Sequence, residues 1–206
     1  MEFVGLGDLH LDGSLSRYLP NLNELIIDEI RKPLNYARSK GISNVIQYGD
    51  LFHKPKASTE GQILLFNLLV EYADLNFFII AGNHDKEATG GSLATHHSLT
   101  FFQAIENAKA LPHVRFFVQQ PEVVSIDGEQ VNMMPWPAKG LVKQALNVIH
   151  CDIDGCLMDN ERKAPSGLDI EGYNVVAGHI HTPQTKHNIS GTLYQTNFGE
   201  SLPKCF

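Results

Sequence analysis

Five short apolar runs, each of a length suited to a buried strand, constrain the fold of this chain most strongly. Helical patterns separate the first three runs, as in the strand–helix–strand units of α/β proteins. A hairpin on Asp127-Gly128 follows later in the chain. We therefore expect an α/β (α+β) sandwich in which two mixed β-sheets pack face to face and are flanked by helices. The apolar runs occupy residues 3–7, 43–49, 76–82, 147–150 and 174–178.

Capping, periodicity and turn residues predict the remaining elements. Thr59 and Gln62 make a capping box at the start of one helix, and Pro33 is expected to bend or interrupt another. The sequence contains no linker-like stretch, so residues 1–206 are predicted to form a single domain. Helices are expected at 21–39, 59–72, 92–110 and 138–147. Further strands are expected at 114–118, 123–134, 185–189 and 192–196.

The predicted helix at 59–72 is apolar on nearly all sides, through the stretch ILLFNLLV at 63–70. One face must cover the sheet, and the remaining apolar surface has two interpretations. It packs beneath the next helix, or it forms a second contact such as a homodimer interface.

Composition and charge narrow the classes of function. The chain has 16 Lys and Arg against 23 Asp and Glu, and a net charge of −7 argues against a broad nucleic-acid-binding surface. No run approaches the roughly 18 apolar residues of a membrane span. The N-terminus lacks the pattern of a signal peptide. No cysteine lies in a C-x-x-C motif, which favours a reducing, cytoplasmic setting for Cys151, Cys156 and Cys205.

Each of the five apolar runs ends in side chains of the kinds that bind metal ions. In open α/β sheets the carboxyl ends of neighbouring strands gather at one edge, so we expect these side chains in one crevice. His179 and His181 are two residues apart and would point to the same side of an extended chain. One Gly-Asp step after a strand is ordinary turn chemistry, but five concurrent cases indicate a site. The residues at the run ends are Asp8, His10, Asp50, Asn83, His84, Asp85, His150, His179 and His181.

The donor types at these ends indicate the kind of metal. They include no cysteine, which argues against a structural zinc site. A mixture of carboxylate, amide and imidazole groups suits divalent ions such as Mn²⁺, Fe²⁺ or Zn²⁺. The candidate ligands are too many for one such ion and enough for two. Two ions roughly 3.5–4 Å apart, bridged by a carboxylate and a hydroxide, promote in-line displacement at phosphorus.

Five motifs in this order resemble those of the calcineurin-like metallophosphoesterase superfamily. They are GDLHL at 7–11, GDLFH at 49–53, GNHD at 82–85, a strand-terminal histidine at 150 and GHIHTP at 178–183. Within the superfamily, GDLFHKPKAS and GNHD are most similar to the SbcD-type DNA-repair exonuclease subunits, including phage recombination versions. The resemblance implies an αββα sandwich and a phosphodiesterase, most similar to a DNA exonuclease or endonuclease, that uses a hydroxide activated by two metals.

The resemblance also implies roles for individual residues. His84 would face the scissile phosphate, stabilise charge and protonate the leaving oxygen, and Asp85 would orient a loop or an imidazole rather than bind metal. The implied cofactors are two divalent ions, with Mn²⁺ expected and Fe²⁺, Zn²⁺ and Mg²⁺ as alternatives. One ion is assigned to Asp8, His10 and His181. The other is assigned to Asn83, His150 and His179, with Asp50 bridging the two.

SbcD-type subunits imply DNA as substrate, a homodimer, an SMC-like ABC ATPase as partner and no membrane. They carry a DNA-capping domain after the core, which is not recognisable within residues 1–206. Two other classes remain open. A phosphatase or nucleotide phosphodiesterase would use the same metals on a small substrate. A catalytically silent scaffold of the same fold would not need His84 or a complete ligand set, and both are present here.

The remaining histidines and nearby lysines have simpler interpretations. His53 lies three residues after Asp50, close enough in sequence to contact substrate. Four other histidines are expected on the surface or in helix packing: His96, His97, His113 and His187. Four lysines follow the ligand motifs, and they form either a basic rim for phosphates or solvated loop residues. These are Lys54, Lys56, Lys86 and Lys186.

Overall fold

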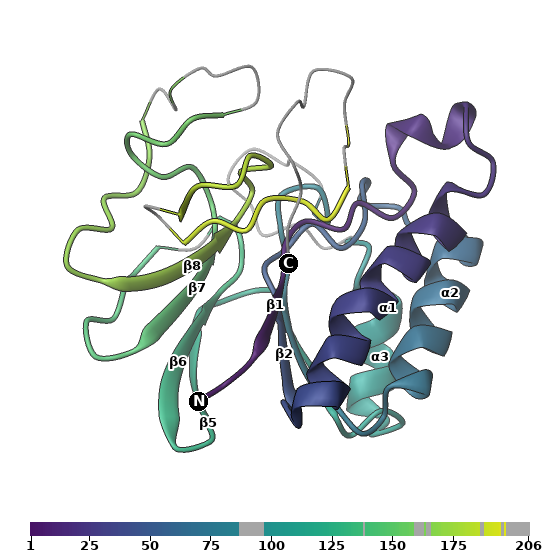
Figure 1. The fold of residues 1–206 in the computed structure, drawn as a ribbon, viewed down its shortest axis with the longest axis horizontal. Coiled ribbons are helices and arrows are strands. Elements are labelled where there is room, and N and C mark those ends of the chain that lie inside the picture. Colours follow the sequence, from purple (N-terminus) through teal and green to yellow (C-terminus); the bar gives the residue numbers. More distant parts are fainter. Residues whose placement is uncertain are drawn as a thin grey trace.

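Two four-stranded β-sheets face each other in the computed structural model, and helices lie on the outer side of one sheet (Figure 1). This arrangement confirms the predicted α/β sandwich. The structure describes residues 1–86, 97–137, 139–158, 163, 166–185, 188–194 and 196.

The first sheet is wholly parallel. Its strands β1 (Val4–Leu6), β2 (Asn44–Gln47), β3 (Asn76–Ile80) and β4 (Val114–Phe117) lie side by side in chain order. A helix lies between each consecutive pair of strands, and such crossovers return the chain in the same direction. The sheet is therefore parallel where we expected a mixed one. All four residues of β2 are buried, as the unbroken apolar runs indicated.

Three helices, α1 (Leu22–Lys40), α2 (Thr59–Glu71) and α3 (Thr100–Asn107), accompany this sheet. The expected interruption at Pro33 is wrong, because α1 continues through it as one helix. The capping box at Thr59 is also wrong. Ser58 is the N-cap, and its hydroxyl oxygen accepts a hydrogen bond of 2.9 Å from the amide of Gly61. The helix predicted at 92–110 is shorter within the described residues, and 87–96 lie outside them.

Helix α2 is divided between a buried and an exposed apolar face. Leu65, Leu68 and Leu69 are buried in the core on the helical side of the first sheet. Ile63 and Val70 keep 54% and 48% of their surface exposed. Burial within the chain therefore accounts for only part of the apolar surface of this helix.

The second sheet is mixed, as predicted. Strands β5 (Glu122–Ile126) and β6 (Glu129–Met134) form the antiparallel hairpin. Its turn residues Asp127 and Gly128 have φ of 49° and 81°, the positive values that a type I′ turn requires. Strands β7 (Leu146–His150) and β8 (Asn174–Gly178) continue the sheet in parallel.

The helix predicted at 138–147 is wrong. Residues 139–145 form a loop, and β7 begins at Leu146. Gly140 has a φ of 124°, which a right-handed helix excludes. The buried side chain of Asn147 then holds the loop, because it accepts from the amide of Val142 at 2.8 Å and donates to its carbonyl at 2.9 Å.

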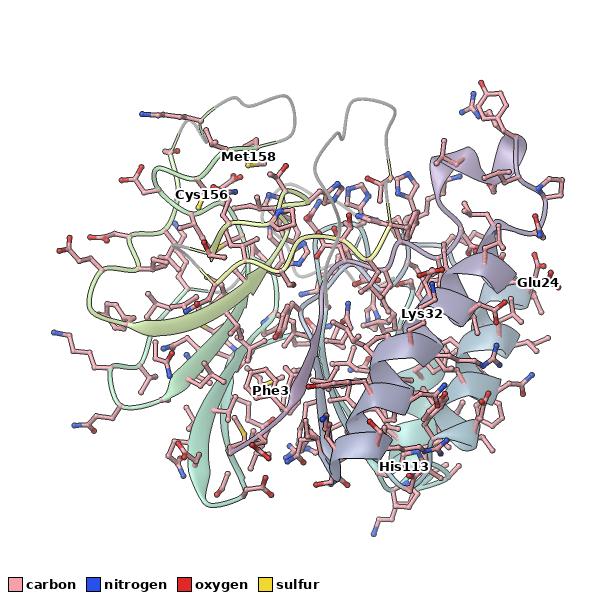
Figure 2. All side chains as sticks on the ribbon, viewed as in Figure 1. Phe3, Glu24, Lys32, His113, Cys156 and Met158 are labelled. Atoms are coloured by element: carbon pink, nitrogen blue, oxygen red, sulfur yellow. The ribbon has the colours of Figure 1, made fainter. Side chains whose placement is uncertain are left out.

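The predicted final strand pair is also wrong for the described residues. Ile189 makes isolated bridges to Gln184 and Ala177, and the described residues of 192–196 contain no strand. Loops, rather than the expected helices, cover the outer face of the second sheet in the described part of the chain. Cys156, which is buried, and Met158 belong to this layer (Figure 2).

The core between the two sheets joins them into one body. Ile46, Ile80 and Phe117 of the first sheet contact a common cluster with Val131 and Val148 of the second. That residues 1–206 form a single domain stays a prediction. No described helix is both long enough and apolar enough to cross a membrane.

Candidate metal centre

The loops that follow β1, β2, β3, β7 and β8 meet at one end of the interface between the sheets. A hydrogen bond crosses this interface, since Nδ1 of His150 lies 2.7 Å from the carbonyl oxygen of Tyr48. Hydrogen bonds and close polar contacts link all of the predicted ligands and His84 into one cluster. The predicted convergence of the strand ends is therefore present in the structure.

The first trio consists of Asp8, His10 and His181, whose donor atoms lie within 4.8 Å of one another. Nε2 of His10 is 3.0 Å from Nε2 of His181. The same nitrogen of His181 is 3.4 Å from Oδ2 of Asp8. Two imidazole nitrogens and a carboxylate oxygen thus point at one small volume, which suits a shared cation.

The second trio consists of Asp50, His150 and His179, and it meets the same distance criterion. The amide oxygen of Asn83 joins it, at 2.9 Å from Nε2 of His150 and 2.8 Å from Nδ1 of His179. Two nitrogens, an amide oxygen and a carboxylate make a donor set suited to a second divalent ion.

Asp50 lies between the two trios. Its Oδ2 is 3.2 Å from Nε2 of His150 and 3.8 Å from Nε2 of His10. Its Oδ1 accepts a hydrogen bond of 2.8 Å from the backbone amide of His84. One carboxylate oxygen is therefore held by the backbone, and the other faces both groups of candidate ligands.

Three of the histidines have a second partner on the ring nitrogen that faces away from the cluster. Such partners fix the tautomer and the orientation of a ligand imidazole. The carbonyl of Tyr48 accepts from Nδ1 of His150 and so leaves Nε2 as the donor atom. Oδ1 of Asp152 lies 3.2 Å from Nε2 of His179. For His181, the outer partner is the hydroxyl of Thr196, 3.0 Å from Nδ1.

Glycine is required at two of the strand ends because the ligands pack against the backbone. A Cβ on Gly49, which has a φ of 100°, would overlap the ring of His150. A Cβ on Gly82 would overlap the carboxylate of Asp50. These two glycines therefore provide space in which the ligands converge.

The profile of one family matches most of this architecture. The calcineurin-like phosphoesterase profile covers residues 1–183, and all of the candidate ligands lie in that range. The chain belongs to the calcineurin-like phosphoesterase family. Members of this family are metal-dependent phosphoesterases that bind two divalent metal ions, and the two groups of donors around Asp50 fit that chemistry.

A phage protein and a solved structure are also similar to this calcineurin-like phosphoesterase. Exonuclease subunit 1 of Enterobacteria phage T4 is 26% identical over 229 residues, an alignment that covers 100% of this chain and 63% of that protein. The chain therefore spans less than two thirds of its relative. The structure of an archaeal phosphodiesterase has a TM-score of 0.41 and 15% identity, with 93% of this chain and 84% of that one covered.

The buried charges of the phosphoesterase site perturb one another. Burial raises the pKa of Asp8 to about 6, although His150 opposes the change. Burial alone would lower the pKa of His150, but Asp50 and Asp8 raise it to about 9. Burial alone would raise the pKa of Asp50, but the charge of His150 and its hydrogen bond lower it. Burial lowers the pKa of His10 and of His179. The two carboxylates thus favour a positive charge on His150, while burial disfavours one on His10 and His179.

His84 and His53 lie beside the first trio. The ring centroid of His84 is 4.9 Å from that of His10 and 5.0 Å from that of His53. Nδ1 of His84 is 3.0 Å from the carbonyl oxygen of His53. This contact occupies Nδ1 and leaves Nε2 as the ring nitrogen that can interact with another partner. His53 also places its Nδ1 at 3.4 Å from Nδ1 of His10. His53 is therefore part of the site, as its spacing from Asp50 suggested.

Asp85 organises the loops and does not face the trios. Its carboxylate accepts hydrogen bonds from the amides of Leu51, Phe52 and Gly82 and from the hydroxyl of Ser98. These contacts tie the loop after β2 to the loop after β3. The expectation that Asp85 orients a loop agrees with this geometry.

The lysines divide into two groups. Lys54 and Lys56 are exposed beside His53, where a basic rim was one interpretation. Lys86 is buried, and its amino group donates to the carbonyl of Trp136, so a place in an exposed rim is wrong for this residue. Lys186 lies outside the described residues.

The other histidines lie away from the trios or outside the description. Nε2 of His113 is 2.9 Å from the carbonyl oxygen of Leu69, in helix packing as predicted, at the far end of the helical layer (Figure 2). His97 is buried next to Ser98. His96 and His187 lie outside the described residues.

Two polar residues at the site were missed by the sequence analysis, Asp152 and Thr196. Asp152 follows His150 by two residues, the same spacing as Asp8 and His10, and this repeat was a usable signal. No local pattern singles out Thr196, because its approach to His181 depends on the path of the chain after β8.

Proposed function

We propose that this calcineurin-like phosphoesterase hydrolyses phosphodiester bonds with two divalent ions, Mn²⁺ by preference, and that DNA is its substrate. The position of Asp50 is the observation that supports the binding of two ions. Its free carboxylate oxygen contacts a histidine of each group, at 3.2 and 3.8 Å. A carboxylate placed in this way holds two cations at once.

In this proposal each group of donors holds one ion. The first would be held by Asp8, His10 and His181, and the second by Asn83, His150 and His179, with Asp50 shared. Bound there, the ions would supply Lewis-acid stabilisation of a phosphoryl transition state and lower the pKa of an attacking water. The outer contacts of the histidines keep the ligand nitrogens aimed at the ions.

His84 is proposed as the general acid for the leaving oxygen. Its amide is fixed to Asp50 at 2.8 Å, and its Nδ1 is fixed to the carbonyl oxygen of His53. Both contacts leave Nε2 as the atom that would carry the proton. The ring therefore has a defined position relative to the shared carboxylate without belonging to either trio.

Two observations support DNA as the substrate. The phage relative is named an exonuclease subunit, and its alignment covers this chain completely. Lys54 and Lys56 are exposed on the loop that carries His53, where phosphates of a bound strand would pass. The word subunit in that name supports our prediction of further partners, and the specific partners, a second copy of the chain and an SMC-like ATPase, stay predictions. Sedimentation at high concentration tests the dimer, and a monomer there would contradict it.

A phosphatase or nucleotide phosphodiesterase acting on a small substrate is the second candidate. The net charge of −7 favours it, because a negative protein repels a long polyanion. A cavity of about 490 Å³ beside Asn83 and His179 is also of a size suited to a small ligand.

Comparing substrates in the presence of Mn²⁺ tests these candidates. We expect cleavage of linear DNA and of bis-p-nitrophenyl phosphate, and little release from the monoester p-nitrophenyl phosphate. Asp50→Asn is the inactive control that excludes a contaminating nuclease. Hydrolysis of small esters without DNA cleavage would replace the DNA proposal with the second candidate. Inactivity of the wild-type protein toward every ester would contradict both.

A further inference from the structure

A cavity of about 490 Å³ adjoins only one side of the candidate metal centre. Its described lining includes Asn83 and His179, from the second group of ligands, and no residue of the first trio. Trp136, Pro137 and Leu168 provide apolar walls, and Lys139 provides a positive charge. The cavity therefore adjoins the second group of ligands, which would hold the second ion.

Trp136 is held firmly beside this cavity by its backbone. Its amide donates a hydrogen bond of 2.9 Å to the carbonyl of Ala81, and its carbonyl accepts from the amino group of Lys86. Both partners belong to the segment after β3 that also carries Asn83. The Trp136 backbone is thus anchored twice to the segment that carries Asn83 of the second group of ligands.

The chemistry of the walls suits one part of a nucleic-acid substrate. An aromatic ring beside a phosphate-binding site offers a face on which a base of any sequence stacks. Lys139 is placed to meet a neighbouring phosphate, and Asp152 and Ser166 offer polar atoms at the lining. A ribose-linked base has this combination of a flat apolar face and polar edges.

We propose that the cavity binds the nucleoside attached to the scissile phosphate, with its base against Trp136. The ring of His84 lies next to His10 of the first trio, whereas the ligands in the described lining of the cavity belong to the second group. The nucleoside in the cavity is therefore the one that remains on the phosphate after the leaving group departs toward His84. This inference rests on the proposed phosphodiesterase function and adds a specificity-determining residue to it.

Two esters with the same leaving group test this specificity. Thymidine p-nitrophenyl phosphate, as the 5′ and the 3′ isomer, is compared with methyl p-nitrophenyl phosphate. We expect the wild-type protein to have a lower KM for at least one thymidine ester than for the methyl ester. Trp136→Ala should remove most of that preference, by roughly 5- to 150-fold, as expected for loss of one base–aromatic stack. Trp136→Phe retains a ring and should restore much of it.

Fluorescence provides a readout that needs no catalysis. Trp136 is the only tryptophan in the chain, so the emission of the wild-type protein reports on this cavity alone. Thymidine monophosphate in the presence of Mg²⁺ should change the emission saturably, and inorganic phosphate at the same concentration should change it much less. This measurement also decides the case if Trp136→Ala does not fold.

The outcomes separate this inference from the proposed function. Equal KM values of the wild-type protein for the thymidine and methyl esters would overturn the inference while leaving the phosphodiesterase intact. An equal fluorescence response to phosphate and nucleotide would overturn it too. Failure to hydrolyse any ester would contradict the proposed function, and the titration would still identify what the cavity binds.

Discussion

The two sheets contribute to the candidate metal centre in different ways. The first sheet is parallel, is covered by three described helices, and supplies Asp8, His10, Asp50, Asn83 and His84. The second sheet is mixed, is covered by loops in the described residues, and supplies His150, His179 and His181. Every carboxylate of the proposed ligand set comes from the helix-covered sheet.

This division shows that neither sheet alone makes a complete ligand group. The first trio takes His181 from the second sheet, and the second group takes Asp50 and Asn83 from the first. Metal binding should therefore stabilise the packing of the two sheets, because ligands that bind only the folded state shift the folding equilibrium.

The largest effect should come from Asp50→Asn, which removes the shared carboxylate of both groups. We expect the affinity for both ions to fall. Turnover should fall by more than the roughly 10–100-fold that is typical when a residue that only supports a metal ligand is substituted. Metal content after dialysis measures the first effect, and ester hydrolysis measures the second. Asp154→Asn, an exposed carboxyl on a loop, is the matched control. Retention of both ions in Asp50→Asn would contradict the shared role.

His84→Ala tests a residue of the helix-covered sheet that is proposed not to bind metal. Turnover of DNA should fall by roughly 10²–10⁴, the range for loss of a positioned general acid, while both ions stay bound. The loss should be smaller for a nitrophenolate leaving group, which needs little protonation. Equal losses on the two substrates would deny His84 the acid role. Loss of metal from the variant would instead make it a ligand.

Asp152→Asn and Thr196→Val compare the outer partners of the two groups. Asp152 supports His179 at 3.2 Å, and Thr196 supports His181 at 3.0 Å. Each substitution should lower the affinity for one ion by roughly 10–100-fold and leave the affinity for the other nearly unchanged. Calorimetric titration with Mn²⁺ resolves the two sites. If either variant lowered the affinity for both ions equally, the assignment of ligands to separate groups would be wrong.

The smallest effect is expected in the helical layer. Ser58 caps α2 and also donates its hydroxyl to Asp12 at 2.6 Å. Ser58→Ala should lower the free energy of unfolding by about 1 kcal/mol, as for loss of an N-cap, without changing metal stoichiometry. Urea denaturation measures the change. Thr59→Ala is the control, because Thr59 is the first residue of the helix and not its N-cap. Loss of an ion in Ser58→Ala would show that the helical layer positions the ligands directly.

The sequence allowed the strand ends to be predicted because their signal is local. Each combines a buried apolar run with a metal-binding side chain, and four of the five also contain a glycine. Parallel strands bring such ends together without further information. The same reasoning located the hairpin at Asp127-Gly128, where the turn chemistry is specific.

The elements and contacts that the sequence did not predict depend on tertiary structure. The helix expected at 138–147 gave way to a loop held by Asn147, whose partners are visible only once β7 is placed. Pro33 is buried within α1, and the helix continues through it. Asp152 and Thr196 reach their histidines from loops, and no periodicity encodes such contacts.

In our proposal, one centre between the sheets holds two metal ions that share Asp50. The metal stoichiometry of the wild-type protein is measured by equilibrium dialysis against saturating Mn²⁺ followed by elemental analysis. We expect two manganese ions per chain, both lost on chelation and both recovered on adding Mn²⁺. A single ion per chain at saturation would contradict it.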